Sequence, residues 1–397
     1  MINVENLYSS PNALAKYYRK FKVSERLLFT GHSHQAWPDC GFEGQKKAWF
    51  DAAEFVDNKW EKAFEKAEAV KKGFSKLLDD ENGHITLGQN THELVVRFLS
   101  ALPLKKKPKL ITTYGEFHTI RRQLDRLQEE DIEIIKIPTE NLDELPGRII
   151  EKIDDNTAAV LVSKVFFKTG QIAQQFSEVL SACKQFGAEL LIDVYHVLNV
   201  TPFSVKNEKL EEAFFVGGGY KYCQLGEGNC FLRFPKECKL RPVITGWYSE
   251  FSALSNTQNK NIVNYGRGSD LFAGATYDPT SNYRAAEVFN FFHEQNLTPE
   301  FLRKVSQHQI ELISKLFDEA DLDKDKITRD YQTSLKNIAG FLVLTSSSAG
   351  EISNKLKKEG VFTDFRGKSL RIGPAPYISD EQIKSAMDKL IKVARSF

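Results

Sequence analysis

The sequence contains few cysteines, few methionines and no long apolar run. Five cysteines and two methionines occur in 397 residues, and no two cysteines form a CxxC motif. An odd number of cysteines without such spacing favours reduced thiols in a cytoplasmic protein over a disulfide or zinc framework, so we expect no metal site. No apolar run approaches the ~20 residues that cross a bilayer, and the N-terminal segment lacks the apolar core of a signal peptide. We therefore expect a cytoplasmic protein with no membrane partner.

An excess of charge of either sign is also absent. Lys and Arg number 54, Asp and Glu number 53, and the net charge is +1. Such a balance provides no field that would steer the chain onto nucleic acid. Apolar residues at 41% and charged residues at 27% are typical of a globular protein, and the length predicts more than one domain. We therefore expect no nucleic-acid partner.

Short apolar runs rich in β-branched residues occur through the middle of the chain, and most of them are followed by a helical stretch. This alternation is typical of βα units. Such units build a mostly parallel sheet with helices on both faces. We therefore predict an α/β fold with strands at 84–88, 109–114, 132–138, 158–165, 189–195, 214–219 and 230–234.

The C-terminal part has a different pattern. Two helices are expected at 282–295 and 299–319. The strands predicted at 341–347 and 369–374 are each followed by a helix, and the last helix begins with a capping box at Ser379. This order predicts a smaller α+β domain.

The N-terminal segment is expected to pack beside this smaller domain. A polar helical pattern from about Gly44 to Leu78 predicts one long helix that links the parts. The predicted organisation is an N-terminal segment at 1–60, a large domain at 61–285 and a small domain at 286–397.

A lysine stands between two tyrosines in the glycine-rich stretch GGGYKYCQLGEG. This residue, Lys221, follows one predicted strand and precedes another, and Asp193 ends an earlier one. Ligands of open α/β sheets bind at the carboxyl ends of strands, so the pair is expected to line one cleft. Pyridoxal phosphate requires such a pair, because a lysine amine condenses with its aldehyde and a carboxylate pairs with its ring nitrogen. The alternatives are a surface lysine in a hairpin and an aspartate that caps a helix.

The stretch TLGQNTHELVV offers a site for a phosphate group. It runs from a predicted strand through Gly88 into a helix start at Asn90 and Thr91. Backbone N–H groups and the positive end of the helix dipole favour an anion at such a start. A capped helix that binds nothing is the alternative.

Five segments match the motifs of one known family in the same order. They are LLFTGHSHQAWP, DVYHVLNVTPF, GYKYCQLGEG, TGWYSEF and VFTDFRGKSLRIGPAPYIS. The chain resembles class V aminotransferases, which are pyridoxal-phosphate enzymes of fold type I, and within that group it is most similar to kynureninase. The resemblance extends from about Phe29 to Tyr377. It implies a seven-stranded sheet sandwiched by helices, with a smaller α+β domain built from the C-terminus and the N-terminal segment.

The resemblance also assigns roles to individual residues, with pyridoxal 5'-phosphate as the cofactor. The implied catalytic residues are Lys221, which would hold the cofactor and move a proton of the substrate, Asp193 and Tyr220. The implied cofactor-binding residues are Asn90, Thr91, Phe117, Asp193, His196, Tyr220, Lys221, Trp247 and Thr276. The implied substrate-binding residues are Arg371, Ser33 and His32. The planar guanidinium of Arg371 suits a bidentate carboxylate.

Two of these residues imply an assembly. Trp247 and Thr276 match positions that reach the phosphate from the neighbouring subunit. The resemblance therefore implies a homodimer with shared active sites.

Four positions depart from the kynureninase pattern. Ile120 stands where that family has aspartate, and His32 stands where it has asparagine. Ser249 and Glu250 replace a glycine and a histidine. In the family these positions touch the cofactor edge or the aryl end of the substrate, so the resemblance leaves the amino acid substrate open.

Several reactions are compatible with the resemblance. A kynureninase-like enzyme would cleave a Cβ–Cγ bond by hydrolysis and release alanine, whereas an aminotransferase would pass the amino group to a keto acid. A β-lyase would release a group from Cβ. Cysteine desulfurases carry a nucleophilic cysteine shortly before the carboxylate-binding arginine, and the segment from Gly340 to Arg371 contains none, which disfavours a desulfurase.

Two alternatives lie outside these reactions. A pyridoxal-binding protein without turnover would keep the same residues. A dinucleotide-binding Rossmann enzyme would fit the βα alternation, but GGGYKY is not a G-x-G-x-x-G motif that opens a helix.

Overall fold

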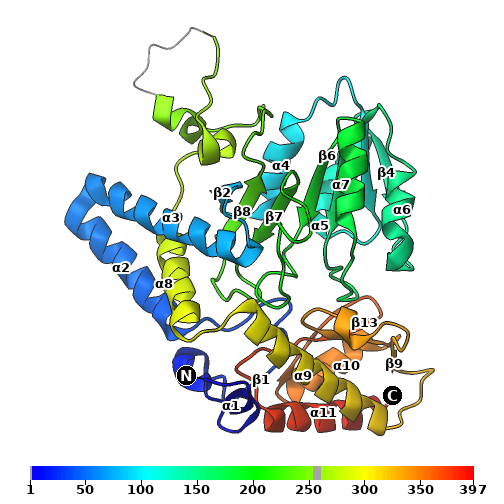
Figure 1. The fold of residues 1–397 in the computed structure, drawn as a ribbon. Coiled ribbons are helices and arrows are strands. Elements are labelled where there is room, and N and C mark those ends of the chain that lie inside the picture. Colours follow the sequence, from blue (N-terminus) through cyan, green and yellow to red (C-terminus); the bar gives the residue numbers. More distant parts are fainter. Residues whose placement is uncertain (1, 254–260) are drawn as a thin grey trace.

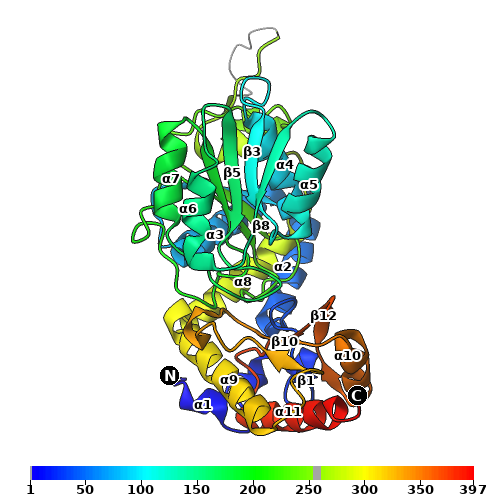
Figure 2. The same ribbon diagram turned by 90° about the vertical axis from the view of Figure 1, so that its right-hand side faces the viewer.

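A seven-stranded sheet forms the centre of the larger part of the molecule, and helices cover both of its faces (Figures 1 and 2). The structure is a computed structural model that describes residues 2–253 and 261–397. The strand order is β2-β8-β7-β6-β5-β3-β4. The strands are β2 (His84–Gly88), β3 (Lys109–Thr113), β4 (Glu133–Ile137), β5 (Thr157–Ser163), β6 (Glu189–Asp193), β7 (Phe214–Gly218) and β8 (Cys230–Phe234).

The sheet is parallel except at β8, which runs antiparallel to both of its neighbours. The central strand β5, with the sequence TAAVLVS, is buried along its whole length. Both faces of a parallel sheet are covered by helices, so its strands are continuous apolar runs rather than alternating ones. The prediction of a mostly parallel α/β sheet is confirmed, and the predicted strand bounds agree within two residues.

Two apolar cores lie on the two faces of the sheet. On one face pack α4 (Thr91–Ala101) and α5 (His118–Gln128), and on the other pack α3 (Lys59–Leu78), α6 (Leu145–Ile150) and α7 (Phe176–Gln185) (Figure 2). From Ala159 to Val162, successive residues of β5 alternate between the cores, as expected from the two-residue period of a strand. Within the described ranges, no helix combines the length and the apolar character needed to span a bilayer.

The single helix expected from about Gly44 to Leu78 is wrong. The chain forms two helices, α2 (Asp39–Phe55) and α3, which are separated by a reversal at Val56, where φ is +49°. A β-branched residue rarely adopts this conformation, so we attribute the reversal to packing. Both helices lie against α8 (Thr280–Glu294) (Figure 1). Gly44 permits the close approach of α2, because a Cβ there would lie 2.7 Å from the carbonyl oxygen of Tyr283.

The smaller part of the molecule is built on a four-stranded antiparallel sheet with the order β12-β13-β10-β9. Its elements are α9 (Pro299–Glu319), β9 (Thr328–Arg329), β10 (Leu342–Thr345), α10 (Ala349–Lys358), β11 (Val361–Phe362), β12 (Asp364–Arg366), β13 (Ser369–Ile372) and α11 (Asp380–Ala394). The N-terminal segment joins this part, since β1 (Leu27–Leu28) pairs in parallel with β11. The predicted capping box at Ser379 is present at the start of α11.

Candidate active site

Lys221 lies in the turn between β7 and β8. The backbone N–H of Gly219 donates to the carbonyl of Asn229 at 2.8 Å and closes this turn. A Cβ at Gly218 would overlap the hydroxyl of Tyr195. The glycines of the turn therefore let Lys221 pack beside Tyr195, with its Nζ 4.5 Å from the centre of the tyrosine ring.

The amine of Lys221 is buried without an ion pair among the described residues. Its side chain is 7% exposed, and Nζ lies 2.8 Å from Nε2 of His196. Burial lowers the pKa of Lys221 to about 7, although the charge of Asp193 acts in the opposite direction. Near neutral pH a large fraction of this amine is therefore unprotonated, which is the nucleophilic form.

Asp193 ends β6 and lines the same cavity as Lys221, with a volume of about 450 Å³. Its Oδ1 accepts a hydrogen bond from the backbone N–H of Tyr195 at 2.8 Å. Burial raises the pKa of Asp193, while this hydrogen bond and the charge of Lys221 act to lower it. The carboxyl ends of β5 and β6 form the floor of the cavity, where Ser163 pairs in register with Asp193.

Most of the sequence-predicted cofactor residues line this cavity together. Seven of them do so, namely Asn90, Thr91, Phe117, Asp193, His196, Tyr220 and Lys221. Five other predicted site residues are not among the lining residues, namely Ser33, His32, Trp247, Thr276 and Arg371.

The start of α4 presents backbone donors to the cavity. Asn90 caps the helix, because its side chain accepts a hydrogen bond from the backbone N–H of Glu93 at 2.9 Å. Thr91 is the first helical residue, and both Asn90 and Thr91 line the cavity. The free N–H groups of a first helical turn and the helix dipole favour an anion at this place.

Tyr220 and two residues of the N-terminal segment lie at one side of the cavity. The ring of Tyr220 stacks on His34 with 4.8 Å between ring centres. The hydroxyl of Ser33 lies 3.3 Å from Nδ1 of His34. Ser33 thus contacts the site through His34 rather than directly.

Arg371 and His32 share a carboxylate that sequence reasoning did not single out. Asp364 on β12 pairs in register with Arg371 on β13. Its Oδ1 accepts from Nε of Arg371 at 2.8 Å, its Oδ2 accepts from Nη2, and Oδ1 also lies 2.8 Å from Nε2 of His32. Nη1 of Arg371 donates to the carbonyl of Phe167 at 2.8 Å. Three of the five guanidinium N–H groups are thus used, and two remain.

Replacing His32 by asparagine, the residue of the family pattern, should make the fold less sensitive to acid. Burial, opposed by the hydrogen bond to Asp364, lowers the pKa of His32 from 6.5 to about 4. Because the folded pKa lies below the unfolded value, the stability that neutral His32 contributes is present above pH 6.5 and is lost as the pH falls toward 4. The loss amounts to roughly 3 kcal/mol at most. Urea unfolding of wild type and His32→Asn at pH 6.5 and at pH 4 measures this loss of unfolding free energy. An equal loss in both proteins would contradict the lowered pKa of His32.

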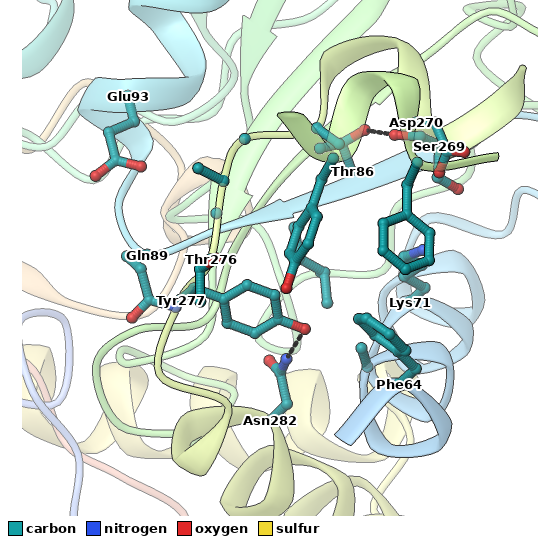
Figure 3. Close-up of a pocket in the computed structure, with 18 of the residues that line it drawn as sticks. Phe64, Lys71, Thr86, Gln89, Glu93, Ser269, Asp270, Thr276, Tyr277 and Asn282 are labelled. Atoms are coloured by element: carbon teal, nitrogen blue, oxygen red, sulfur yellow. Dashed lines mark hydrogen bonds between the residues drawn. The ribbon is translucent and has the colours of Figure 1, made fainter. Parts of the chain in front are cut away.

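Trp247 and Thr276 lie together beside a second cavity. Nε1 of Trp247 donates to Oγ1 of Thr276 at 3.2 Å, and Trp247 is 45% exposed. The second cavity, of about 470 Å³, is lined by Thr276 and by aromatic rings that include Phe64 and Tyr277 (Figure 3). It shares Gln89 with the first cavity, so the two adjoin at the start of α4.

Three of the residues that depart from the kynureninase pattern are held by contacts within the chain. Ile120 is 1% exposed and belongs to the core beneath α4 and α5, so no polar group replaces the family aspartate there. The hydroxyl of Ser249 is bound within its own turn, to the carbonyl of Gly246 at 2.8 Å. Glu250 accepts from the backbone N–H of Asn264 at 2.6 Å. All three side chains serve local structure.

Sequence reasoning also missed a buried acid beside the cavity. Glu116 is 3% exposed and bonds to Thr113 and Ser163. Glu116 immediately precedes Phe117, but glutamates are common and only the fold shows that this one is buried. Within residues 2–253 and 261–397, no group of three or more His, Cys, Asp or Glu side chains is arranged to hold a metal ion.

The comparison with known proteins supports the fold. No family model matches the chain. The uncharacterized aminotransferase YcbU of Bacillus subtilis (strain 168) is 20% identical over 349 residues, which cover 86% of this chain and 88% of that protein.

Solved structures of similar fold cover nearly the whole chain. The apo cysteine desulfurase from Thermococcus onnurineus NA1 matches with a TM-score of 0.80 and 15% identity over 98% of both chains. A mutant of C-DES with glycine covalently linked to its PLP cofactor matches with a TM-score of 0.78 and 12% identity over 95% of this chain and 98% of that one. The cysteine desulfurase CsdA of Escherichia coli has a TM-score of 0.76 and 12% identity over all of both chains. The chain therefore has the fold of these proteins, which is fold type I.

Proposed function

We propose that this chain is a pyridoxal-phosphate-dependent enzyme that acts on an amino acid, as an aminotransferase. The observation that carries the proposal is the buried amine of Lys221, which shares one cavity with the carboxyl of Asp193 at the carboxyl ends of the strands. YcbU, similar over most of the chain, is named as an aminotransferase, and C-DES, of similar fold, holds this cofactor.

The residues of the cavity fit the cofactor. Within the described part of the chain, Nδ1 of His196 is buried without a hydrogen-bond partner, and Oδ2 of Asp193 accepts no hydrogen bond. Both residues line the cavity. Buried polar groups of this kind are normally paired. Lys221 would hold the cofactor covalently, Asp193 would pair with its ring nitrogen, and the start of α4 would bind its phosphate. When bound, the cofactor supplies an electron sink for bonds at the substrate's α-carbon.

The chain's own side chains would then move and hold protons. A pKa near 7 allows the Nζ of Lys221 both to accept and to donate a proton at neutral pH. Nε2 of His196 is within hydrogen-bond distance of this amine and orients it. The pKa of His196 lies well below its usual value, first because of burial and then because of the charge of Lys221, so the imidazole stays neutral and can accept the amine's hydrogen.

Arg371 would bind the α-carboxylate of the substrate through its two remaining N–H groups. Replacing Arg371 by alanine should raise KM for the amino acid by roughly tenfold to a hundredfold, because charge-assisted hydrogen bonds contribute about 1.5–3 kcal/mol. Cofactor affinity should change much less, and the loss should be absent for the corresponding amine, which has no carboxylate. Steady-state kinetics with both substrates measure this. An equal loss for the amine would remove Arg371 from carboxylate binding.

A kynureninase-like hydrolysis is the second candidate. It is favoured by the ordered motifs that the chain shares with that family, whereas Ile120, a core residue in place of the family aspartate, favours a different substrate. The segment from Gly340 to Arg371 has no cysteine, so the nucleophile of a cysteine desulfurase is missing.

One screen separates these reactions. The holoenzyme is supplied with a panel of amino acids with and without keto acids, and keto acid, alanine and ammonia are measured. Amino transfer predicts keto-acid formation that requires an added acceptor. Alanine from kynurenine would select hydrolysis instead, and a cofactor-loaded protein that turns over no amino acid would contradict the proposal.

The proposed enzyme is a homodimer in which Trp247 and Thr276 reach the partner's phosphate site. Phe251, which is 47% exposed, lies beside Trp247 with 5.4 Å between ring centres, and exposed aromatic groups of this kind are typical of an interface. Sedimentation of the active enzyme tests the assembly, and full activity in a monomer would contradict it.

A further inference from the structure

Glu116 is a buried carboxyl group whose two oxygens have different hydrogen-bond partners. Glu116 lies in the loop that follows β3. Its side chain is hydrogen-bonded to Ser163 at the end of β5. Oε1 accepts two hydrogen bonds, from the Thr113 hydroxyl at 2.7 Å and from the backbone N–H of Ser163 at 3.1 Å. The Thr113 hydroxyl also accepts from the N–H of Gly115 at 3.1 Å.

Oε2 faces the hydroxyl of Ser163 at 2.5 Å. Because the backbone N–H of Ser163 can only donate, its contact keeps Oε1 an acceptor and favours the proton of Glu116 on Oε2, where it donates to Oγ of Ser163. When Glu116 is ionised, the same contact requires the opposite direction, with the Ser163 hydroxyl as the donor. The hydroxyl hydrogen of Ser163 is thus held by Glu116 in the ionised state and released from Glu116 in the protonated state.

Ser163 connects this contact to the active site. It lines the cavity beside its register partner Asp193. Within the described ranges, Glu116 is the one hydrogen-bond partner of the Ser163 hydroxyl. When the hydroxyl accepts from Glu116, its own hydrogen is released from that contact and can point into the cavity.

We propose that Glu116 is a positioning residue that sets the direction of the Ser163 hydroxyl, so that the cavity offers a bound molecule a hydrogen-bond donor only while Glu116 carries a proton. The acceptor is an oxygen or nitrogen atom of the bound molecule, which under the proposed function is pyridoxal phosphate or its adduct with the substrate. Glu116 acts through Ser163.

The surroundings of Glu116 bring its pKa close to neutral pH. Burial raises the pKa of Glu116 from 4.5 to about 7, against the hydrogen bonds from Ser163 and Thr113. Asp193 at the end of β6 is the ionisable group whose charge acts on Glu116, and it raises the pKa further, whereas Thr113 and Ser163 are neutral. Both forms of Glu116 are therefore populated near neutral pH.

The test compares cofactor binding in four full-length proteins: wild type, Glu116→Gln, Ser163→Ala and the double variant. The amide of glutamine donates to Ser163 at every pH and so reproduces the protonated state. The dissociation constant for pyridoxal phosphate should be similar in wild type and Glu116→Gln at pH 5.5. At pH 8.5 wild type should bind about threefold to tenfold more weakly, the effect of one lost hydrogen bond. With Ser163→Ala in both proteins the difference should vanish.

The matched control is Glu189→Gln. Glu189 is the first residue of β6, at the opposite end from Asp193, and burial raises its pKa too. The dissociation constant of this variant should therefore equal that of wild type at both pH values. The proposal would be overturned if the ratio of the two dissociation constants, wild type over Glu116→Gln, did not change with pH. A change that persists with Ser163→Ala would also overturn it, since the charge would then act directly.

Unfolding of the cofactor-free chain tests the same contact without a ligand. Because the folded pKa of Glu116 lies above the unfolded one, its contribution is complete below pH 4.5 and is lost as the pH rises through 7. The urea midpoint of wild type should therefore fall relative to that of Glu116→Gln between these values, and parallel midpoints would overturn the proposal. If no protein bound pyridoxal phosphate, the proposed function would fail, while this unfolding comparison would still decide the protonation of Glu116.

Discussion

Replacing Lys221 by alanine should abolish covalent attachment of pyridoxal phosphate and lower turnover of any amino acid substrate by at least about 10³-fold. The expected effect is large because one amine is assigned two tasks, covalent attachment and proton transfer, and positioned acid–base groups alone contribute roughly 10²–10⁴-fold. The fold should persist, since removing a buried lysine that has no ion pair among the described residues leaves no charge uncompensated. The visible absorbance of the bound cofactor and steady-state rates measure the two losses.

Lys168→Ala is the control for this variant. Lys168 lies in the loop that follows β5 and is exposed to solvent, so its removal should change neither absorbance nor turnover. Lys164 is less suitable, because its buried Nζ is paired with Glu208 at 2.6 Å and its loss would leave a charge unpaired. Retention of the cofactor's covalent absorbance in Lys221→Ala would contradict the assignment of Lys221.

Replacing Asp193 by asparagine should leave cofactor binding nearly intact and lower kcat by about 10²-fold or more. A carboxylate opposite a ring nitrogen holds that nitrogen in its protonated form, and an amide does not, so charge that develops during the reaction is less stabilised. The amide oxygen can still accept the hydrogen bond from the N–H of Tyr195, which preserves the end of β6. Cofactor titration and single-turnover rates separate the two effects.

Glu189→Gln serves as the control for Asp193→Asn, because both carboxyl groups belong to β6 and burial raises the pKa of each. Only Asp193 lines the cavity. Rates of Asp193→Asn within about twofold of wild type would count against the pairing, and a similar fall in Glu189→Gln would point to damage of the strand instead.

The sheet could be predicted from the sequence because its strands carry their signal locally. A run such as TAAVLVS is apolar at every position, since both faces of β5 are buried. The break at Val56 was not predicted, because no glycine or proline marks it in the sequence, and both helices that it joins pack on α8, which is distant in sequence.

Some residues of the candidate site likewise have a local sequence signal, and others do not. Lys221 and the start of α4 are signalled by glycines and a capping residue close to them in sequence. Asp364 lies within the motif VFTDFRGKSLRIGPAPYIS, but its bidentate contact with Arg371 depends on the pairing of β12 with β13. Glu116 has no local signal at all, because its burial depends on strands that are distant in sequence. The roles of Trp247 and Thr276 stay predictions, since they depend on a second copy of the chain.

Peptide mapping shows which lysine holds the cofactor. The wild-type protein is loaded with pyridoxal phosphate, reduced with borohydride and digested, and the modified peptide is identified by mass spectrometry. We expect a single phosphopyridoxyl group on Lys221, in the peptide that contains GGGYKYCQLGEG. A stoichiometric label on any other lysine, or no stable label at saturating cofactor, would contradict it.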